Sequence, residues 1–394
     1  MIDVLIVGAG PAGSSAAIRL ARQGLEVLLV DRCRFPRLKP CGEYYNPEGC
    51  HLLAELGVLP GIHAAGAHPV EALQLVAGKG CGLVVPFAGL SSQNRALSLG
   101  REVLDTLLVE EARRSGAVVW EEALVREPLW EAGAVCGGVV RIDGVEREVR
   151  ARLTLAADGL RSRFARCLGL GVGDGGRKKI GLAARYRLAA GVPPRVLMSA
   201  VGDGCCGLAV RGGEANLGMV ADGSRAREMG GDPAAFFQRE LARFPQLAEC
   251  VDGSPKSLRT VGSLTWLTRR QSMAGCLLLG DAAGFYDPFT GQGVTFALLT
   301  ARIAARIALE ALADHDLSAR RLEQYSRERR RLLGPKLLVQ RIIQGVIAQP
   351  RLLDHVVDRL NRRPETARTL VGVIADVLPA NQAMWPGFLA RLVL

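Results

Sequence analysis

The order of a strand, a glycine-rich turn, a helix and a second strand at the start of the chain constrains the fold more than any other feature. Residues 4–7 are all apolar and largely β-branched, which predicts a buried parallel strand. A helix is expected over residues 14–23, followed by a second apolar strand over residues 27–30. Such a βαβ unit predicts an α/β fold with a Rossmann-like parallel sheet.

The glycines of this turn follow the spacing G-x-G-x-x-G, and each has a physical role. Gly8 permits the tight turn, Gly10 lets the backbone approach a pyrophosphate, and Gly13 lets the helix pack closely on the strand. The helix N-terminus presents free N–H groups to phosphates. Asp31, which ends the second strand, is placed to accept hydrogen bonds from a ribose. The sequence therefore predicts a dinucleotide site; the alternative is an ordinary βαβ unit with glycines at its turn.

Composition narrows the class of protein. The 394 residues allow two or three domains, and the formal net charge is +11. A basic chain suggests nucleic acid, a membrane surface or an anionic substrate as partner. No nucleic-acid-binding motif accompanies the charge, so we favour an arginine-rich composition and expect no nucleic-acid partner.

The ten cysteines and five histidines are scattered along the chain. None of the cysteines forms a C-x-x-C pair and none groups with histidine at zinc spacing, so no metal site is expected. The chain starts directly in a strand without a signal peptide, and no apolar run is long enough to span a membrane. We therefore expect a cytoplasmic protein with free thiols.

Two later stretches change from βαβ to hairpin patterns. Residues 70–87 are expected to form a β-hairpin around the Gly-Lys-Gly turn at 78–80, with Lys79 in solvent. Residues 181–220 alternate short strands with glycine-rich turns, which predicts an antiparallel sheet.

Two more loops carry acids directly after apolar strands. The first is Asp158-Gly159, although Asp-Gly is also common in ordinary turns. The second is Asp281, after the strand CLLLG, and it leads through Pro288 and the G-Q-G run at 291–293 into a long helix that ends near Ala313.

The chain from Leu317 onward is expected to be helical. Its arginine run at positions 327 and 329–331 is interpreted as a solvated helix face. The alternative is that this basic region, with the apolar end around Trp385 and Phe388, docks on a membrane or an acyl-carrier partner.

Three motifs in this order, VGAGPAGSSAA at 7–17, AADG at 156–159 and GDAAGFYDPFTGQG at 280–293, resemble the p-hydroxybenzoate hydroxylase superfamily of FAD enzymes. The runs KPCGE at 39–43 and DPFTGQGVTFAL at 287–298 resemble its geranylgeranyl reductase branch. Gly284 and Thr295 stand where aromatic hydroxylases carry His and Asn, and the halogenase run W-x-W-x-I-P is absent. The stretch at 204–220 lacks the aromatic residues that the reductases carry there.

The resemblance implies a Rossmann-like FAD-binding domain of the p-hydroxybenzoate hydroxylase type, an antiparallel β-sheet substrate domain and a helical C-terminal region. The FAD-binding domain would be discontinuous and comprise residues 1–69, 95–175 and 270–316. The substrate domain would comprise 70–94 and 176–269, and the helical region 317–394.

The resemblance also implies which residues bind non-covalent FAD. The pyrophosphate would lie on the glycine turn, the adenosine ribose on Asp31, the adenine on the backbone of Val125, the ribityl chain on Asp281, and the isoalloxazine on residues 291–294. The full expected set is Gly8, Gly10, Ala12, Gly13, Asp31, Arg32, Gly42, Arg101, Val125, Asp158, Asp281, Pro288, Gly291, Gln292, Gly293 and Val294.

The function implied is that of a FAD-dependent oxidoreductase acting on a hydrophobic small molecule such as a lipid, isoprenoid or polyketide, by C=C reduction of the geranylgeranyl reductase kind. NAD(P)H or another reductant would supply the electrons. The alternative is an NAD(P)H-dependent monooxygenase or halogenase-like tailoring enzyme, and a non-enzymatic flavin sensor is a third reading. Cys41 is the candidate catalytic residue, as a proton donor beside the flavin; a buried apolar cysteine away from the ring is the alternative.

Overall fold

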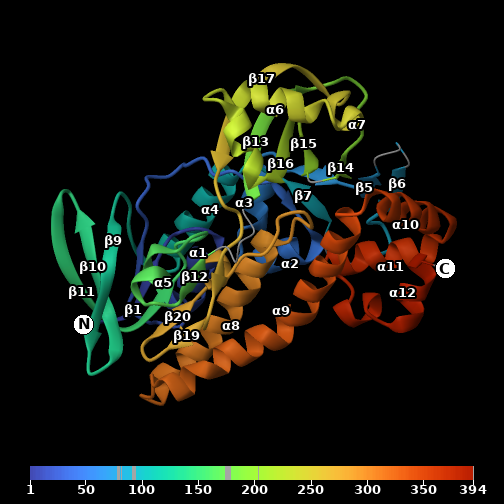
Figure 1. Cartoon of the computed structure of the whole chain (residues 1–394). Coiled ribbons are helices and arrows are strands. Elements are labelled where there is room, and N and C mark those ends of the chain that lie inside the picture. Colours follow the sequence, from blue (N-terminus) through green and yellow to red (C-terminus); the bar gives the residue numbers. More distant parts are fainter. Residues whose placement is uncertain (78–79, 81, 91–94, 174–178, 203, 394) are drawn as a thin grey trace.

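The computed structural model describes residues 1–77, 80, 82–90, 95–173, 179–202 and 204–393. Three regions lie next to one another in Figure 1. A mainly parallel sheet with long helices holds the N-terminus, a second sheet lies above it, and a group of helices at the C-terminus lies beside both. The division of the chain into domains stays a prediction.

The first sheet has the strand order β19-β20-β11-β1-β2-β8. The central strands pair in parallel, whereas β19 pairs antiparallel at the edge. The sheet and its antiparallel extension comprise β1 (Ile2–Val7), β2 (Val27–Val30), β8 (Val118–Trp120), β9 (Leu124–Glu131), β10 (Ala134–Ile142), β11 (Val145–Ala156), β19 (Ser272–Met273) and β20 (Cys276–Leu278). The strand β9 was not expected from the sequence.

Alternation along β1 explains why this region has three layers. Val4 and Ile6 belong to an apolar cluster with α1 (Pro11–Ala21), α4 (Arg101–Arg114) and α8 (Gly293–Ala313). Leu5 and Val7 point to the other face, where they pack in a cluster with β9, β10 and α5 (Arg163–Cys167). The sheet is therefore covered on both faces, as a parallel sheet requires.

The first helix begins three residues earlier than the sequence predicted. Pro11 occupies its first turn, where a residue without an N–H group leaves no hydrogen bond unmade. Gly10 is the N-cap and Arg22 the C-cap. The glycine turn therefore leads directly into the helix N-terminus.

The second sheet has the order β17-β13-β16-β15-β14-β5-β6. Its strands are β5 (Ala72–Val76), β6 (Gly82–Pro86), β13 (Lys179–Leu188), β14 (Arg195–Val201), β15 (Gly204–Arg211), β16 (Glu214–Asp222) and β17 (Val251–Val261). All neighbours are antiparallel except β5 and β14, which pair in parallel. This pair departs from the expected antiparallel sheet. Gly78 and Lys79 lie outside the described residues.

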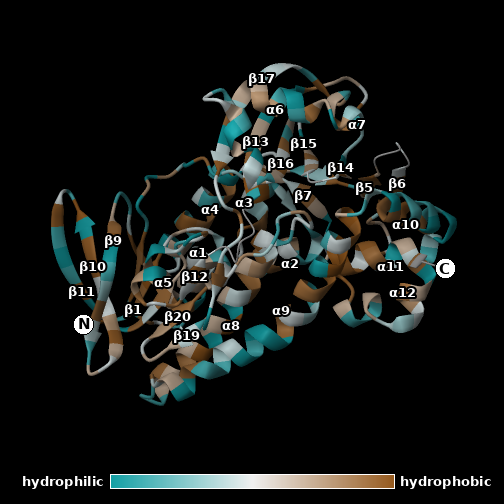
Figure 2. Ribbon diagram, in the orientation of Figure 1, coloured by the Kyte–Doolittle hydropathy of each residue, from teal (hydrophilic) through white to brown (hydrophobic). Residues whose placement is uncertain are grey.

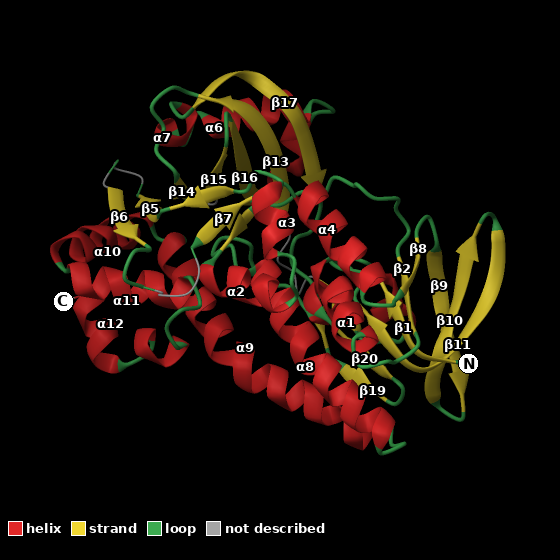
Figure 3. Cartoon of the chain, turned by 180° about the vertical axis from the view of Figure 1, so that it is seen from behind, coloured by secondary structure: helices red, strands yellow, loops and turns green. Residues whose placement is uncertain are grey.

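The outer face of this sheet is covered by short helices, and the inner face looks toward the first region (Figures 1 and 3). The covering elements are η1 (Gly223–Met229), α6 (Pro233–Leu241) and α7 (Pro245–Ala248). Phe236 and Phe237 of α6 are buried in the cluster under them. Smaller elements join the two regions: β3 (Tyr44–Tyr45), β4 (His68–Val70), β7 (Ala96–Ser98), α2 (Pro47–Glu55), α3 (Leu59–Ala64), β12 (Gly171–Gly173), β18 (Leu267–Thr268) and η2 (Gly280–Ala283).

The C-terminal region is helical, as expected. It comprises α9 (Ala319–Ile347), α10 (Pro350–Arg362), α11 (Pro364–Ile374), η3 (Ala380–Ala383) and α12 (Pro386–Val393). Figure 2 shows hydrophobic residues where α10 and α11 approach α9, and their apolar faces form one cluster with β5 and β6. Within the described residues, every helix is too short or too polar to cross a membrane.

The arginine run on α9 is mostly a solvated face. Arg327, Arg330 and Arg331 are exposed. Arg329 differs, because burial lowers the pKa of its guanidinium and it lines a small cavity with Asp281. The apolar end is also divided: the Trp385 side chain is exposed, whereas Phe388 is buried.

Candidate active site

The glycine turn between β1 and α1 contains two glycines that the fold itself requires. Gly8 has φ +99°, and a Cβ there would lie 2.5 Å from the carbonyl oxygen of Ala157. A Cβ at Gly13 would lie 1.8 Å from the carbonyl oxygen of Gly8. At Gly10, by contrast, the nearest atom would be Nη2 of Arg37 at 3.7 Å. The protein thus leaves room above Gly10, so a ligand must account for a glycine at this position.

Asp31 ties the end of β2 to this turn. Its Oδ2 accepts a hydrogen bond from the backbone N of Ala9 at 2.8 Å, and its Oδ1 accepts one from Cys33 N at 2.9 Å. The carboxylate is buried. Asp31 therefore holds the shape of the glycine turn, and its contact with a ribose stays a prediction.

An extended cavity runs from this turn, across the ends of β11 and β20, to the N-terminus of α8. Its walls come from segments far apart in the sequence: the turn at 10–12, the loop at 39–44, the start of α4, and the loops after β11 and β20. The expected site residues that line it are Gly10, Ala12, Cys41, Gly42, Arg101, Asp281, Pro288, Gly291, Gly293 and Val294.

Some expected site residues do not line this cavity. Val125 is buried against the underside of the first sheet, and Arg32 is exposed. The other residues outside the cavity wall are Gly8, Gly13, Asp31, Asp158 and Gln292. The basic residue that lies near the glycine turn is Arg37 and not Arg32.

Asp158 has a local structural role. Its carboxylate accepts hydrogen bonds from Ser162 Oγ at 2.5 Å and from Phe164 N at 3.1 Å. Burial raises the pKa of this carboxyl group. Asp158 thereby shapes the turn that presents Gly159 and Leu160 to the cavity.

Two arginines of the cavity region share one buried acid, Asp105. Arg101 forms a two-pronged ion pair with Asp105, with both N–O distances 2.8 Å. Nη1 of Arg37 lies 3.2 Å from the same carboxylate. This pairing fixes the guanidinium of Arg101 at the start of α4.

Gln292 points away from the cavity into a buried polar network. Its Nε2 donates to Asp376 at 2.8 Å, and Asn46 Nδ2 donates to the other oxygen of that carboxylate at 2.8 Å. Lys336 of α9 completes the set as an ion pair with Asp376 at 2.5 Å. The network connects the C-terminal helices to the loop that precedes α8.

A second network anchors the loop that carries Cys41. Glu43 is buried with φ +55°, and its Oε1 accepts hydrogen bonds from Arg101 N at 3.3 Å and from Arg185 of β13 at 2.6 Å. Arg211 of β15 lies 3.4 Å from its Oε2. Asn216 of β16 donates to the carbonyl oxygen of Cys41 at 2.8 Å. The Cys41 loop is therefore held by three strands of the second sheet and by the start of α4.

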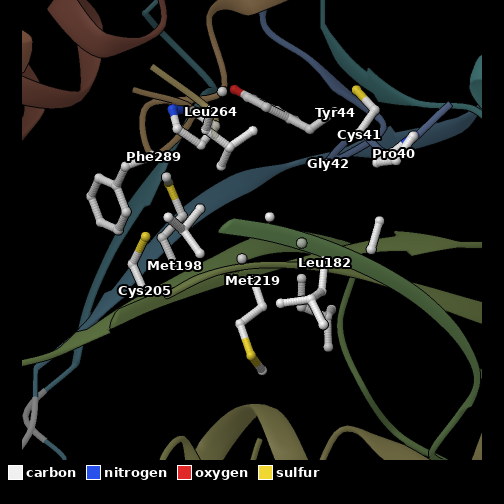
Figure 4. Close-up of a pocket in the computed structure, with 18 of the residues that line it drawn as sticks. Pro40, Cys41, Gly42, Tyr44, Leu182, Met198, Cys205, Met219, Leu264 and Phe289 are labelled. Carbon is white, nitrogen blue, oxygen red and sulfur yellow. The ribbon is translucent and has the colours of Figure 1, made fainter. Parts of the chain in front are cut away.

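Cys41 lies in the wall between the first cavity and a second one. The second cavity lies under the inner face of the second sheet, and Pro40, Cys41, Gly42 and Tyr44 line both. Figure 4 shows this loop across the cavity from the strands that carry Leu182 and Met219. The sulfur of Cys41 is directed away from those strands and accepts a weak hydrogen bond from Glu43 N at 3.5 Å.

Small residues widen this second cavity. Gly207 pairs with Gly218 across β15 and β16, and Gly218 pairs with Ala183 of β13. A Cβ at Gly218 would come no closer than 3.6 Å to Gly42. The small residues of the stretch at 204–220 thus leave space in this cavity that aromatic side chains at the same positions would fill.

A third cavity continues from the second. Met198 and Phe289 line both, and the remaining walls are apolar side chains of α9 to α12, β5 and β14. Phe388 is one of them. The second cavity, which Cys41 also lines, and the third are therefore adjacent apolar cavities that meet at Met198 and Phe289.

Comparison with known proteins places the chain in a family. Residues 1–337 match the family described as FAD binding domain. The chain is 33% identical to digeranylgeranylglycerophospholipid reductase 1 of Methanopyrus kandleri, covering 82% of this chain and 84% of that protein. A reductase of the same name from Methanosarcina acetivorans is 28% identical over 97% of this chain and 94% of its own length.

Solved structures share the fold. A geranylgeranyl bacteriochlorophyll reductase-like protein from Thermoplasma acidophilum has a TM-score of 0.82 at 24% identity, covering 99% of this chain and 98% of that one. A myxobacterial chondrochloren halogenase has a TM-score of 0.77 at 25% identity, covering 86% and 82%. The expected fold class is confirmed, and the chain belongs to the FAD-binding family as a FAD-dependent oxidoreductase.

Proposed function

We propose that this enzyme reduces carbon–carbon double bonds of an isoprenoid lipid. The observation that carries the proposal is the apolar space that starts at the cofactor cavity and continues between the C-terminal helices. A long, branched hydrocarbon chain matches such a space because it has no polar groups to satisfy. Relatives named as digeranylgeranylglycerophospholipid reductases support the same substrate class.

The residues present fit FAD. The open space above Gly10, at the N-terminus of α1, suits a pyrophosphate. Arg101 and Asp281 line the middle of the cavity, and Gly291, Gly293 and Val294 line its far end. When bound there, reduced FAD supplies a hydride. The N-terminus of α8 directs a partial positive charge to that end, which favours an anionic ring.

Cys41 is our candidate for the proton that C=C reduction requires besides the hydride. The proposal is supported by the position of Cys41 in the wall that the cofactor cavity and the second cavity share. The other thiol of the substrate cavity, Cys205, is less suited because burial strongly raises its pKa. A role for Cys41 in shaping the pocket is the alternative.

A monooxygenase or halogenase-like activity is the second candidate, supported by the likeness to the chondrochloren halogenase. Absorption spectra of the reduced enzyme, recorded with and without oxygen, distinguish the reductase from the monooxygenase. A reductase reoxidises its flavin anaerobically when digeranylgeranylglycerophospholipid is added. Reoxidation that needs oxygen, with the lipid only enhancing it, would favour the monooxygenase.

The electron donor and the site of action belong to the proposal as well. We propose NAD(P)H or another reductant as donor, and peripheral contact with a membrane through the basic C-terminal helices. Leu338 of α9 and Trp385 before α12 are exposed apolar side chains in this region. A lipid substrate resides in a membrane, so an enzyme that acts on it would bind at the membrane surface.

A further inference from the structure

Lys39 is a partly buried cation that lines the cofactor cavity. It precedes Pro40 and Cys41 in the loop between β2 and β3, and lines the cavity together with Gly10, Arg101 and Asp281. Its Nζ lies 3.5 Å from the position that a Cβ at Gly159 would occupy. The ammonium therefore lies against the backbone after β11, facing the same cavity as the glycine turn.

The charges around Lys39 are already paired with one another. Arg101 and Arg37 share the carboxylate of Asp105, at 2.8 Å and 3.2 Å, and Arg37 also lies 3.6 Å from Asp31. Among the described residues, none forms a hydrogen bond or ion pair with the Lys39 ammonium. The charge of Asp281 favours the charged form of Lys39, although the two side chains are too far apart to form an ion pair.

An unpaired ammonium in such surroundings is costly. Removal from water disfavours the charged form, and burial accordingly lowers the pKa of Lys39. Charged groups removed from water in proteins are usually paired, so an anionic ligand in this cavity would supply the missing partner. The anion of FAD is its pyrophosphate, and the turn at Gly10 with the N-terminus of α1 suits a pyrophosphate in the same cavity.

We propose that Lys39 binds the pyrophosphate of FAD, as the side-chain cation that complements the backbone N–H groups of the glycine turn. The proposal rests on FAD binding alone and is independent of the lipid substrate. It also gives a reason for the pairing of the two arginines. Asp105 and Asp31 pair with the two arginines, whereas Lys39 forms no ion pair among the described residues and is left to meet the cofactor.

The test is FAD binding to the apoprotein, measured by quenching of flavin fluorescence. Lys39→Met should weaken FAD binding by roughly 10- to 100-fold, because a charge-assisted hydrogen bond is lost. Lys39→Arg should keep most of the affinity. Lys256→Met is the matched control: it removes the same charge from an exposed ion pair with Glu214, and FAD affinity should not change.

Thermal unfolding of the apoprotein separates this role from a structural one. Without FAD, the melting temperature of Lys39→Met should equal or exceed that of the wild type, because the substitution breaks no ion pair among the described residues and removes a partly desolvated charge. Saturating FAD should raise the melting temperature of the variant by less than it raises that of the wild type. The proposal would be overturned if Lys39→Met kept an FAD affinity within threefold of the wild type. It would also be overturned if the apoprotein of the variant melted at a lower temperature while its FAD affinity was unchanged.

Discussion

Asn216 on β16 donates a hydrogen bond to the carbonyl oxygen of Cys41 at 2.8 Å, and so joins the second sheet to the loop that lines both main cavities. The two residues are 175 positions apart in the chain. The amide side chain is buried, and it holds the backbone of Cys41 rather than its thiol. This contact fixes the backbone of the Cys41 loop in the wall that the two cavities share.

Asn216→Ala should therefore impair catalysis more than cofactor binding. Loss of the hydrogen bond frees the Cys41 loop, and a small displacement of a reacting group costs roughly 10-fold or more in turnover. FAD affinity should stay within about twofold, because the bond lies on the substrate side of the loop. Steady-state kinetics and flavin titration measure the two effects. A large loss of FAD with normal turnover of the remaining holoenzyme would contradict this assignment.

Cys41→Ala tests the thiol directly. The variant should bind FAD and accept electrons normally, yet lose lipid turnover by ~10²-fold or more if the thiol donates the proton. Cys205→Ala, in the same substrate cavity, is the control and should keep most activity. Unchanged turnover in Cys41→Ala would leave the residue with only a role in shaping the pocket.

Gly10 and Gly13 should respond differently to the same substitution. Gly10→Ala should leave the melting temperature of the apoprotein unchanged, because the new Cβ meets nothing closer than 3.7 Å, and should weaken FAD binding by roughly 10-fold or more. Gly13→Ala should destabilise the apoprotein itself, since its Cβ would collide with the carbonyl oxygen of Gly8. Equal effects of both changes on apoprotein stability would refute this distinction.

Asp376→Asn should destabilise the fold by about 3 kcal/mol, because it leaves the Lys336 ammonium buried without a counter-charge. Asparagine tolerates the left-handed backbone at this position, φ +61°, so the backbone needs no change. Glu214→Gln breaks the exposed ion pair with Lys256 and should cost less than ~1 kcal/mol. Urea unfolding gives both values. Similar costs for the two variants would show that the network contributes little.

The sequence predicted those features that local pattern determines. The apolar run of β1, the glycine spacing and the strand before Asp31 identified the cofactor region, and the G-Q-G run marked the start of α8. The start of α1 was missed although Pro11 is a typical first-turn residue. The strand β9 was missed because its run LVREPLWE contains a proline and charged residues and so lacks a clear strand pattern.

The contacts that assemble the site could not be predicted from the sequence. Asn46 and Asp376 are 330 positions apart, and no local period indicates that they meet. The pairing of Arg37 and Arg101 through Asp105, which leaves Lys39 unpaired, likewise appears only in the folded chain. The cavity that extends between the C-terminal helices depends on the packing of α9 to α12 against the second sheet.

The most direct test of the proposed function is the mass of the product from an anaerobic turnover. Chemically reduced holoenzyme is mixed with digeranylgeranylglycerophospholipid without oxygen, and the lipid is analysed by mass spectrometry. Reduction adds two hydrogens for each double bond, so the account predicts a lipid about 2 Da heavier for each flavin oxidised. An unchanged lipid under these conditions, with a product about 16 Da heavier once oxygen is admitted, would contradict it.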